Sequence, residues 1–170
     1  MIKLLIVEDE EIIREGIVHM LNWEAYHISI SGAVANGKEA LEHFKTCPPD
    51  LLLTDIRMPV MDGLQLIKEA RQYSRSFLPI ILSGYNDFNY AKQGLVLGVS
   101  DYILKPCRPE DLLKSILSAK QHWEERQKTD RTMQQLQSTW SKNRTLAKQH
   151  KLIQWLEDRK EGIENRNKEL

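Results

Sequence analysis

Four apolar runs of this chain end in side chains that are suited to chemistry. In chain order these side chains are Glu8 with Asp9, Asp55, Ser83 and Lys105. If the runs are parallel strands, their carboxyl ends lie along one edge of a sheet, where the reactive groups of open α/β folds gather. The spacing therefore predicts a cluster of acids with a hydroxyl and an ammonium group beside them.

The predicted cluster has the composition of a phosphoryl-transfer site. The carboxylates of Glu8, Asp9 and Asp55 would repel one another unless a hard divalent cation lay among them, and carboxylate oxygens suit Mg²⁺. In such a site Asp55 attacks an incoming phosphoryl group, while the metal, Lys105 and Ser83 stabilise the charge on the transferring oxygens. The product is an aspartyl phosphate, whose free energy can bias a two-state change in the surrounding loops.

Each of these residues also has an ordinary structural interpretation. Asp9 can cap the helix that begins near Glu11, and a serine at a strand end, such as Ser83, is usually a turn or capping hydroxyl. A lysine before a proline, such as Lys105, is usually a solvated surface residue, and Asp62-Gly63 is interpreted as an ordinary turn. The functional interpretation depends on the joint pattern, because separate segments would have to place compatible groups at one sheet edge by accident.

The elements that must position these groups follow from the alternation of apolar runs and amphipathic stretches, which is typical of βαβ units. We expect five strands: Ile2–Val7, Ile28–Val34, Leu51–Thr54, Ile80–Ser83 and Tyr102–Leu104. Apolar residues at helical spacing predict helices that cover the sheet: Ile12, Ile13, Gly16, Ile17, Met20 and Leu21; Ala40, Leu41 and Phe44; and Leu64, Leu66, Ile67 and Ala70. The predicted fold class is α/β with a parallel sheet.

After Pro109 the pattern indicates one long helix, because the next glycine or proline is Gly162. From Lys128 to Leu156 the apolar residues thin to a loose period near 3.5 or 3.6, which fits either half of a coiled coil or a single solvated helix that partly frays. We therefore expect one domain at residues 1–125 and a helical linker or tail at 126–170 that frays at its end.

Composition excludes several classes of protein. Residues 1–106 hold 10 basic and 14 acidic groups and residues 107–170 hold 14 and 10, which sum to 24 of each. The basic charge of the tail is dispersed and lacks a recognition helix, so we expect no direct nucleic-acid binding.

Two distant cysteines, Cys47 and Cys107, favour a reducing cytoplasm over a disulfide framework or a zinc site. We expect no signal peptide and no membrane span, because about 18 consecutive apolar residues occur nowhere.

Four segments resemble the signature segments of the response-regulator receiver domains of bacterial two-component systems. These segments are Leu5-Ile6-Val7-Glu8-Asp9-Glu10, Thr54-Asp55-Ile56-Arg57-Met58-Pro59-Val60-Met61-Asp62-Gly63, Ile81-Leu82-Ser83-Gly84 and Tyr102-Ile103-Leu104-Lys105-Pro106. They occur in the family's order within roughly residues 2–125. Two further segments, Ile13-Arg14-Glu15-Gly16 with Asn22-Trp23 and Ser83-Gly84-Tyr85-Asn86-Asp87-Phe88-Asn89-Tyr90-Ala91, are similar to receivers that precede AraC-type DNA-binding domains.

This resemblance implies a flavodoxin-like (βα)5 fold, a doubly wound parallel sheet of strand order 2-1-3-4-5, here with a C-terminal helical extension. It implies that a sensor histidine kinase phosphorylates Asp55, and that Mg²⁺ binds Asp9, Asp55 and the backbone carbonyl of Arg57, with Glu8 supporting the metal through water. Ser83 and Lys105 then respond to the phosphoryl group. Such a receiver is a phosphoacceptor rather than an enzyme, with only assisted autophosphorylation and autodephosphorylation.

The resemblance also implies a conformational switch. Tyr102 matches the family's aromatic switch position, whose ring turns inward as the strand-four hydroxyl, Ser83, moves. The surface of helix four, strand five and helix five then becomes the face of a homodimer, and the Lys105–Pro106 bond is often cis. We expect transcription to be controlled through an output domain absent from this chain.

Two departures from the family pattern stand out. Glu8 occupies a position where the family most often has aspartate, and its extra methylene is expected to move the carboxylate and change metal affinity without abolishing it. The AraC-type relatives continue into two helix-turn-helix units, whereas this sequence ends at Leu170. The chain is therefore either a fragment or a short regulator that acts through its tail.

The lifetime of the phosphorylated form is expected to be long. The family tunes hydrolysis through the second residue after the phosphorylated aspartate and the second after the strand-four hydroxyl, which here are Arg57 and Tyr85. Both side chains are bulky, so they are expected to obstruct the attacking water.

Three alternatives remain beside this interpretation. A receiver-like dimerisation scaffold that never takes phosphate would lack part of the site, whereas this one has every group. A phosphohydrolase of the haloacid dehalogenase type would carry a second acid where Arg57 stands. A flavin-binding protein of the same fold would want a run of hydrogen-bond donors where this chain has acids.

Overall fold

The structure, a computed structural model, describes residues 1–84, 88–135 and 137. Five strands form one parallel sheet in the order β2-β1-β3-β4-β5. Their bounds are Ile2–Val7 for β1, Ile28–Val34 for β2, Leu51–Asp55 for β3, Leu78–Ser83 for β4 and Asp101–Leu104 for β5. The predicted fold class and strand order are confirmed.

The strand β4 begins two residues before its predicted start at Ile80, and the reason is Pro79. A proline lacks the N–H that a sheet ladder uses, so the sequence pattern argues against a strand at that position. In the structure Pro79 is the second residue of β4, opposite Leu52 of β3. Its carbonyl accepts a hydrogen bond from the backbone N–H of Ser100 at 2.7 Å, so this residue still joins the sheet to the segment that leads into β5.

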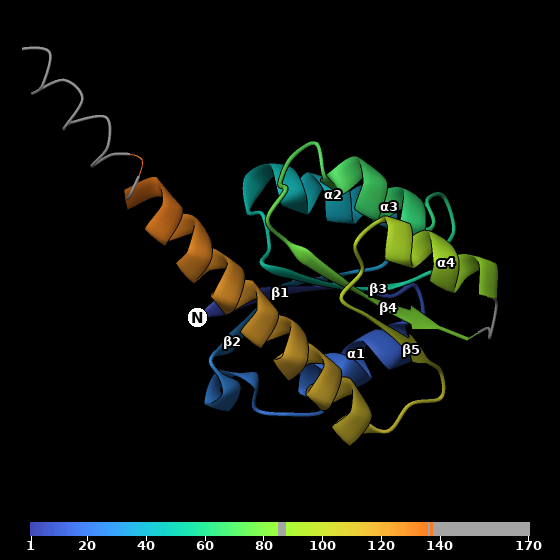
Figure 1. Cartoon of the computed structure of the whole chain (residues 1–170). Coiled ribbons are helices and arrows are strands. Elements are labelled where there is room, and N and C mark those ends of the chain that lie inside the picture. The colour runs from blue at the N-terminus through green and yellow to red at the C-terminus, as the bar shows by residue number, and fades with distance from the viewer. Residues whose placement is uncertain (85–87, 136, 138–170) are drawn as a thin grey trace, which may run out of the picture. The chain divides into compact units, whose positions relative to one another are not determined.

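Helices cover both faces of the sheet (Figure 1). Their bounds are Glu11–His19 for α1, Gly37–Thr46 for α2, Gly63–Ala70 for α3 and Phe88–Val96 for α4, with a 3-10 turn at Trp23–Tyr26 and helical residues at 109–135. One apolar cluster lies under α2 and α3, and the other joins α1 to the C-terminal helix through Leu112, Ile116 and Ala119. The parallel strands between these layers read as continuous apolar runs because both of their faces are buried.

The helix α1 buries a narrower stripe than its sequence predicts. Ile17 is buried, but Ile12 is 89% exposed and Gly16 also lies at the surface. The indole N–H of Trp23 donates to the carbonyls of Ile17 at 3.2 Å and Val18 at 3.0 Å, so Trp23 satisfies two carbonyls in the last turn of α1. These bonds attach the turn that follows α1 to the helix itself.

The chain divides into two compact units, Met1–Glu125 and Arg126–Leu170. In the second unit the structure describes 126–135 and 137, which are helical and, apart from Gln127, exposed. The predicted coiled-coil pattern as far as Leu156 lies mainly outside the described residues. Among the residues that are described, no helix combines the length and the apolar character that a membrane span requires.

Candidate functional site

The sheet brings the predicted strand-end groups to one edge. Asp55 and Ser83 are the last residues of β3 and β4, while Glu8 and Lys105 directly follow β1 and β5. Because neighbouring strands are all parallel, these four side chains lie at the shared carboxyl edge of the sheet. The predicted clustering of these groups is therefore present in the fold.

The ammonium group of Lys105 joins two of the acids. Its Nζ donates to Oε2 of Glu8 and to Oδ2 of Asp55, each at 2.6 Å. The side chains of Lys105, Glu8 and Asp55 are 18%, 0% and 11% exposed, so water screens these contacts little. Burial acts to lower the pKa of Lys105, but the hydrogen bonds to Asp55 and Glu8 outweigh burial and raise it. Lys105 therefore stays charged and offsets part of the negative charge.

Glu8 places a carboxylate in the interior of the protein. Burial raises the pKa of Glu8, and the hydrogen bond from Lys105 only partly opposes this effect. Its Oε1 is buried and has no hydrogen-bond partner among the residues that the structure describes. A buried polar atom without a partner costs about 1–3 kcal/mol, and more when it is charged. This oxygen therefore marks a position where a further ligand would stabilise the protein.

A divalent cation fits this position. Carboxylate oxygens of Glu8, Asp9 and Asp55 all lie within 4.8 Å of one another, and Asp9 is only half-buried, so the group remains accessible. Oxygen ligands with net negative charge suit Mg²⁺. The structure thus brings together an acidic cluster of Glu8, Asp9 and Asp55, and their role as metal ligands stays a prediction.

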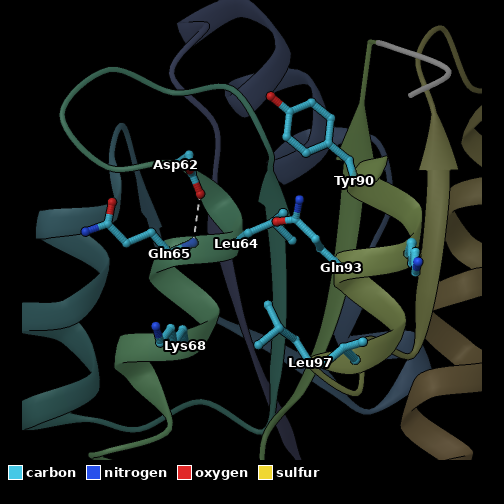
Figure 2. Close-up of a pocket in the computed structure, with 9 residues that line it drawn as sticks. Asp62, Leu64, Gln65, Lys68, Tyr90, Gln93 and Leu97 are labelled. Atoms are coloured by element: carbon cyan, nitrogen blue, oxygen red, sulfur yellow. Dashed lines mark hydrogen bonds between the residues drawn. The ribbon is translucent and has the colours of Figure 1, made fainter. Parts of the chain in front are cut away.

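The loop after β3 is held close to the site by its own backbone. The N–H of Arg57 donates to Oδ1 of Asp55 at 3.3 Å, and the N–H of Gly63 donates to the carbonyl of Ile56 at 2.8 Å. A Cβ on Gly63 would lie 2.1 Å from the backbone oxygen of Asp55, so only glycine fits there. Asp62 is not part of an ordinary turn, because its side chain caps α3 by accepting a hydrogen bond from the N–H of Gln65 at 2.7 Å (Figure 2).

The side chain of Arg57 contacts the start of α4. Its guanidinium lies 5.8 Å from the ring centroid of Tyr90, a cation–π contact. Figure 2 shows Tyr90 and Gln93 of α4 across from Leu64 and Gln65 of α3, along a cavity of about 500 Å³. The contact therefore links Arg57, in the loop after β3, to α4, which lies across this cavity from α3.

Of the remaining predicted residues, Ser83 ends β4 and Tyr102 lies within β5. Ser83 is buried, and Tyr102 of β5 is half-buried against the cluster under α2 and α3, as is Tyr90. The Lys105–Pro106 peptide bond is cis, as the resemblance implies. Tyr85, the second residue predicted to tune hydrolysis, lies outside the described residues.

Sequence reasoning missed one residue that contacts the site. Nη1 of Arg14, in α1, donates to the backbone carbonyl of Glu8 at 2.8 Å and approaches that of Asp9 at 3.5 Å. The sequence showed Arg14 only as part of a subfamily segment. Its position six residues after Glu8 places Arg14 on the predicted helix, but this spacing does not indicate that the side chain turns back to the loop.

Comparisons with known proteins agree with this geometry. The model of the response regulator receiver domain matches residues 4–117. The chain is 40% identical over 116 residues to the uncharacterized transcriptional regulatory protein YesN of Bacillus subtilis, covering 68% of this chain and 32% of that protein. It is 41% identical over 106 residues to the transcriptional regulatory protein HptR of Staphylococcus aureus, covering 62% of this chain and 41% of that protein. The chain thus spans less than half the length of these relatives.

A solved structure supports the same assignment. The REC domain of AraT, a response regulator from Geobacillus stearothermophilus, is 38% identical and superposes with a TM-score of 0.69, covering 74% of this chain and 98% of that one. Family match, fold and strand-edge acids therefore agree, and this chain belongs to the response regulator receiver domain family.

Proposed function

We propose that this chain is the phosphoacceptor receiver of a two-component response regulator and that Asp55 takes the phosphoryl group from a sensor histidine kinase. The observation that carries the proposal is the double contact of Lys105 with Glu8 and Asp55, beside the unpartnered Oε1 of Glu8. A half-buried ammonium group beside the Asp55 carboxylate supports this proposal, because the same ammonium can neutralise charge on the transferring oxygens. The receiver acts as a regulatory module in the cytoplasm, not as an enzyme with turnover.

Mg²⁺ would be held by Glu8, Asp9, Asp55 and the backbone carbonyl of Arg57, and when bound it supplies positive charge to the phosphoryl oxygens. An oxygen of Asp55 forms the new bond to phosphorus as the bond from phosphorus to the kinase histidine nitrogen breaks, and the electron pair of that bond returns to the imidazole. Lys105 moves its hydrogen bond from Asp55 to a phosphoryl oxygen, and the hydroxyl of Ser83 donates to another.

The response to phosphorylation runs through Ser83 and Tyr102. As Ser83 turns toward the phosphoryl group, the half-buried ring of Tyr102 moves inward and the face of α4, β5 and the C-terminal helix forms a homodimer. The helical tail passes dimerisation to an output module that controls transcription, while this chain itself binds no DNA. Light scattering with and without a phosphate mimic tests the dimer, and a monomer in both states well above micromolar concentration would contradict it.

The lifetime of the phosphorylated form depends on Arg57 and Tyr85. The backbone N–H of Arg57 donates to Oδ1 of Asp55 at 3.3 Å, and the bulky side chain of this neighbouring residue obstructs the attacking water. We expect slower dephosphorylation than in a variant that carries Arg57→Asn and Tyr85→Glu. A half-life of seconds in the native chain, or equal rates in both, would contradict this role.

The experiment that tests the proposal is incubation with Mg²⁺ and acetyl phosphate, followed by intact mass and a phosphate-affinity gel. We expect the gain of one phosphoryl group, and we expect this gain to require both Mg²⁺ and Asp55, so that Asp55→Ala gains none. A folded chain that gains no phosphoryl group under any condition would instead favour a receiver-like dimerisation scaffold that works without phosphorylation.

A further inference from the structure

Arg14 is the side chain that links α1 to the acidic loop between β1 and α1. Its Nη1 donates to the carbonyl of Glu8 at 2.8 Å and lies 3.5 Å from that of Asp9. The backbone N–H of Arg14 also donates to the carbonyl of Glu10 at 2.9 Å, in the first turn of the helix. One half-buried residue thus contacts the backbone of each of the three residues that connect β1 to α1.

The two ends of this loop are held differently within the described residues. The N–H of Glu8 still belongs to the sheet, because it donates to the carbonyl of Val34 at 3.1 Å. Glu10, the N-cap of α1, makes no side-chain capping bond within the described part of the chain. A guanidinium offers several N–H donors in a rigid fork, so the Arg14 side chain can hold the carbonyls of Glu8 and Asp9 in place.

We propose that Arg14 is a positioning residue for the cation site: it fixes the peptide planes of Glu8 and Asp9 so that their carboxylates face Asp55. The inference deepens the proposed function and rests on its metal site. Among the described residues, the guanidinium of Arg14 donates to the backbone oxygens of Glu8 and Asp9, so in this proposal it neither binds the cation nor contacts the phosphoryl group. It therefore acts through Glu8 and Asp9.

Because Arg14 is charged, the direction of the change in Mg²⁺ affinity on its replacement tests the inference. A positive charge close to a cation site repels the cation, so removal of charge alone would tighten Mg²⁺ binding. Loss of positioning has the opposite effect, because the acids must then be ordered when the cation binds. One hydrogen bond to a carbonyl contributes about 1 kcal/mol, or about fivefold in affinity, and a partly buried charged donor somewhat more.

The experiment measures Mg²⁺ affinity of the full chain by NMR titration of backbone amides, together with the free energy of unfolding without metal. The variants are Arg14→Met, Arg14→Lys and Arg14→Gln. Arg71→Met is the matched control, because the Arg71 guanidinium also donates to backbone carbonyls, those of Arg75, Phe77 and Leu97, at the opposite end of α3 from the site. Both Met variants should lower stability, which a purely structural role for Arg14 also predicts.

Only Arg14→Met should weaken Mg²⁺ binding, by about three- to tenfold, while Arg71→Met leaves it unchanged. Arg14→Lys and Arg14→Gln retain a hydrogen-bond donor and should weaken Mg²⁺ binding less than Arg14→Met. If Arg14→Met does not fold, these two variants are compared with the native chain instead. Unchanged or tighter binding in Arg14→Met, tighter binding in Arg14→Gln, or equal weakening in both Met variants would overturn the inference. A native chain that binds no Mg²⁺ overturns both proposals, whereas Mg²⁺ binding without phosphorylation of Asp55 overturns only the proposed function.

Discussion

Replacing Lys105 by methionine should turn the site from a stabilised cluster into a repulsive one. Methionine keeps most of the length of the stem but removes the ammonium group that contacts Glu8 and Asp55 at 2.6 Å. In the absence of metal, two largely buried carboxylates are then left without their shared partner. Removal of one member of a buried ion pair typically costs about 3–5 kcal/mol, mainly because a buried charge remains unpaired.

The magnitude can be estimated in two ways for this site. Carboxylate oxygens of Glu8 and Asp55 lie within 4.8 Å of each other, and two unit charges at that distance repel by about 3.5 kcal/mol at an effective dielectric constant of about 20. The protein can avoid this repulsion by protonating Glu8. From an ordinary pKa of 4.5, that protonation costs about 3.4 kcal/mol at pH 7. Both routes predict a loss of about 3 kcal/mol at neutral pH.

The loss should depend on pH with a definite sign. Burial already raises the pKa of Glu8, and removal of Lys105 raises it further. A folded state whose carboxyl pKa lies above the unfolded value binds more protons than the unfolded state, so its stability falls as pH rises through that window. The pKa of Lys105 in the native protein is raised, so its ammonium stays charged throughout this range. The gap between Lys105→Met and the native chain should therefore shrink as pH falls below neutrality, by at most about 1.4 kcal/mol for each pH unit, because the pKa of Glu8 is already raised in the native chain.

Urea unfolding in EDTA, followed by circular dichroism between about pH 5 and pH 8, measures this gap. Adding Glu8→Gln to Lys105→Met should restore part of the stability, because it removes one of the two charges. Lys45→Met is the control, since its ion pair with Glu42 is exposed and should contribute little. A gap under about 1 kcal/mol at pH 7, or an equal gap at pH 5 and pH 7, would refute the reasoning and indicate that Lys105 acts through packing alone.

Three further predictions concern Gly63, Val60 and Trp23. Gly63→Ala should lower the free energy of unfolding by at least about 2 kcal/mol, since its Cβ would lie 2.1 Å from the backbone oxygen of Asp55. Gly16→Ala should raise this free energy by about 0.5–1 kcal/mol, because no atom lies within 4 Å of the added Cβ. Urea unfolding of both variants checks this pair, and equal effects of the two substitutions would contradict it. Val60→Gly should raise the free energy of unfolding by about 1 kcal/mol, because Val60 has φ of +74° and is 70% exposed. If the variant instead unfolds at a lower temperature than the native chain, backbone strain at this residue is not the cause. Trp23→Phe should cost about 1 kcal/mol in urea unfolding through the lost indole hydrogen bonds at the end of α1, and an unchanged midpoint would show that these bonds contribute nothing.

Most of the fold follows from local sequence pattern. The central strand β3 could be recognised because Leu51, Leu52 and Leu53 form an apolar run with no breaker, as a parallel strand buried on both faces requires. The pattern was less informative where tertiary contacts override it. Pro79 enters β4 because its carbonyl is used, and Ile12 is exposed because only one stripe of α1 faces the sheet.

The site was predictable only in part, for a physical reason. The positions of Glu8, Asp55 and Lys105 follow from strand ends, since a parallel sheet gathers its carboxyl ends at one edge. Which side chains touch across that edge depends on side-chain direction, and no sequence spacing encodes it. The turn of Arg14 back to the loop and the contact of Arg57 with Tyr90 are of this second kind, and only the structure reveals them.

The Lys105 contacts also bear on the proposed switch. An ammonium group has three donors, and two of them are used here by Glu8 and Asp55. These bonds stabilise the acids only while no stronger cation or phosphoryl group competes for them. In the proposed phosphorylation, the Oδ2 of Asp55 would give up its bond to Lys105 or share the ammonium with a phosphoryl oxygen. Under the proposed function, the residue that stabilises the acids is therefore the one whose partners would change on phosphorylation, and this would couple the chemistry at Asp55 to the end of β5.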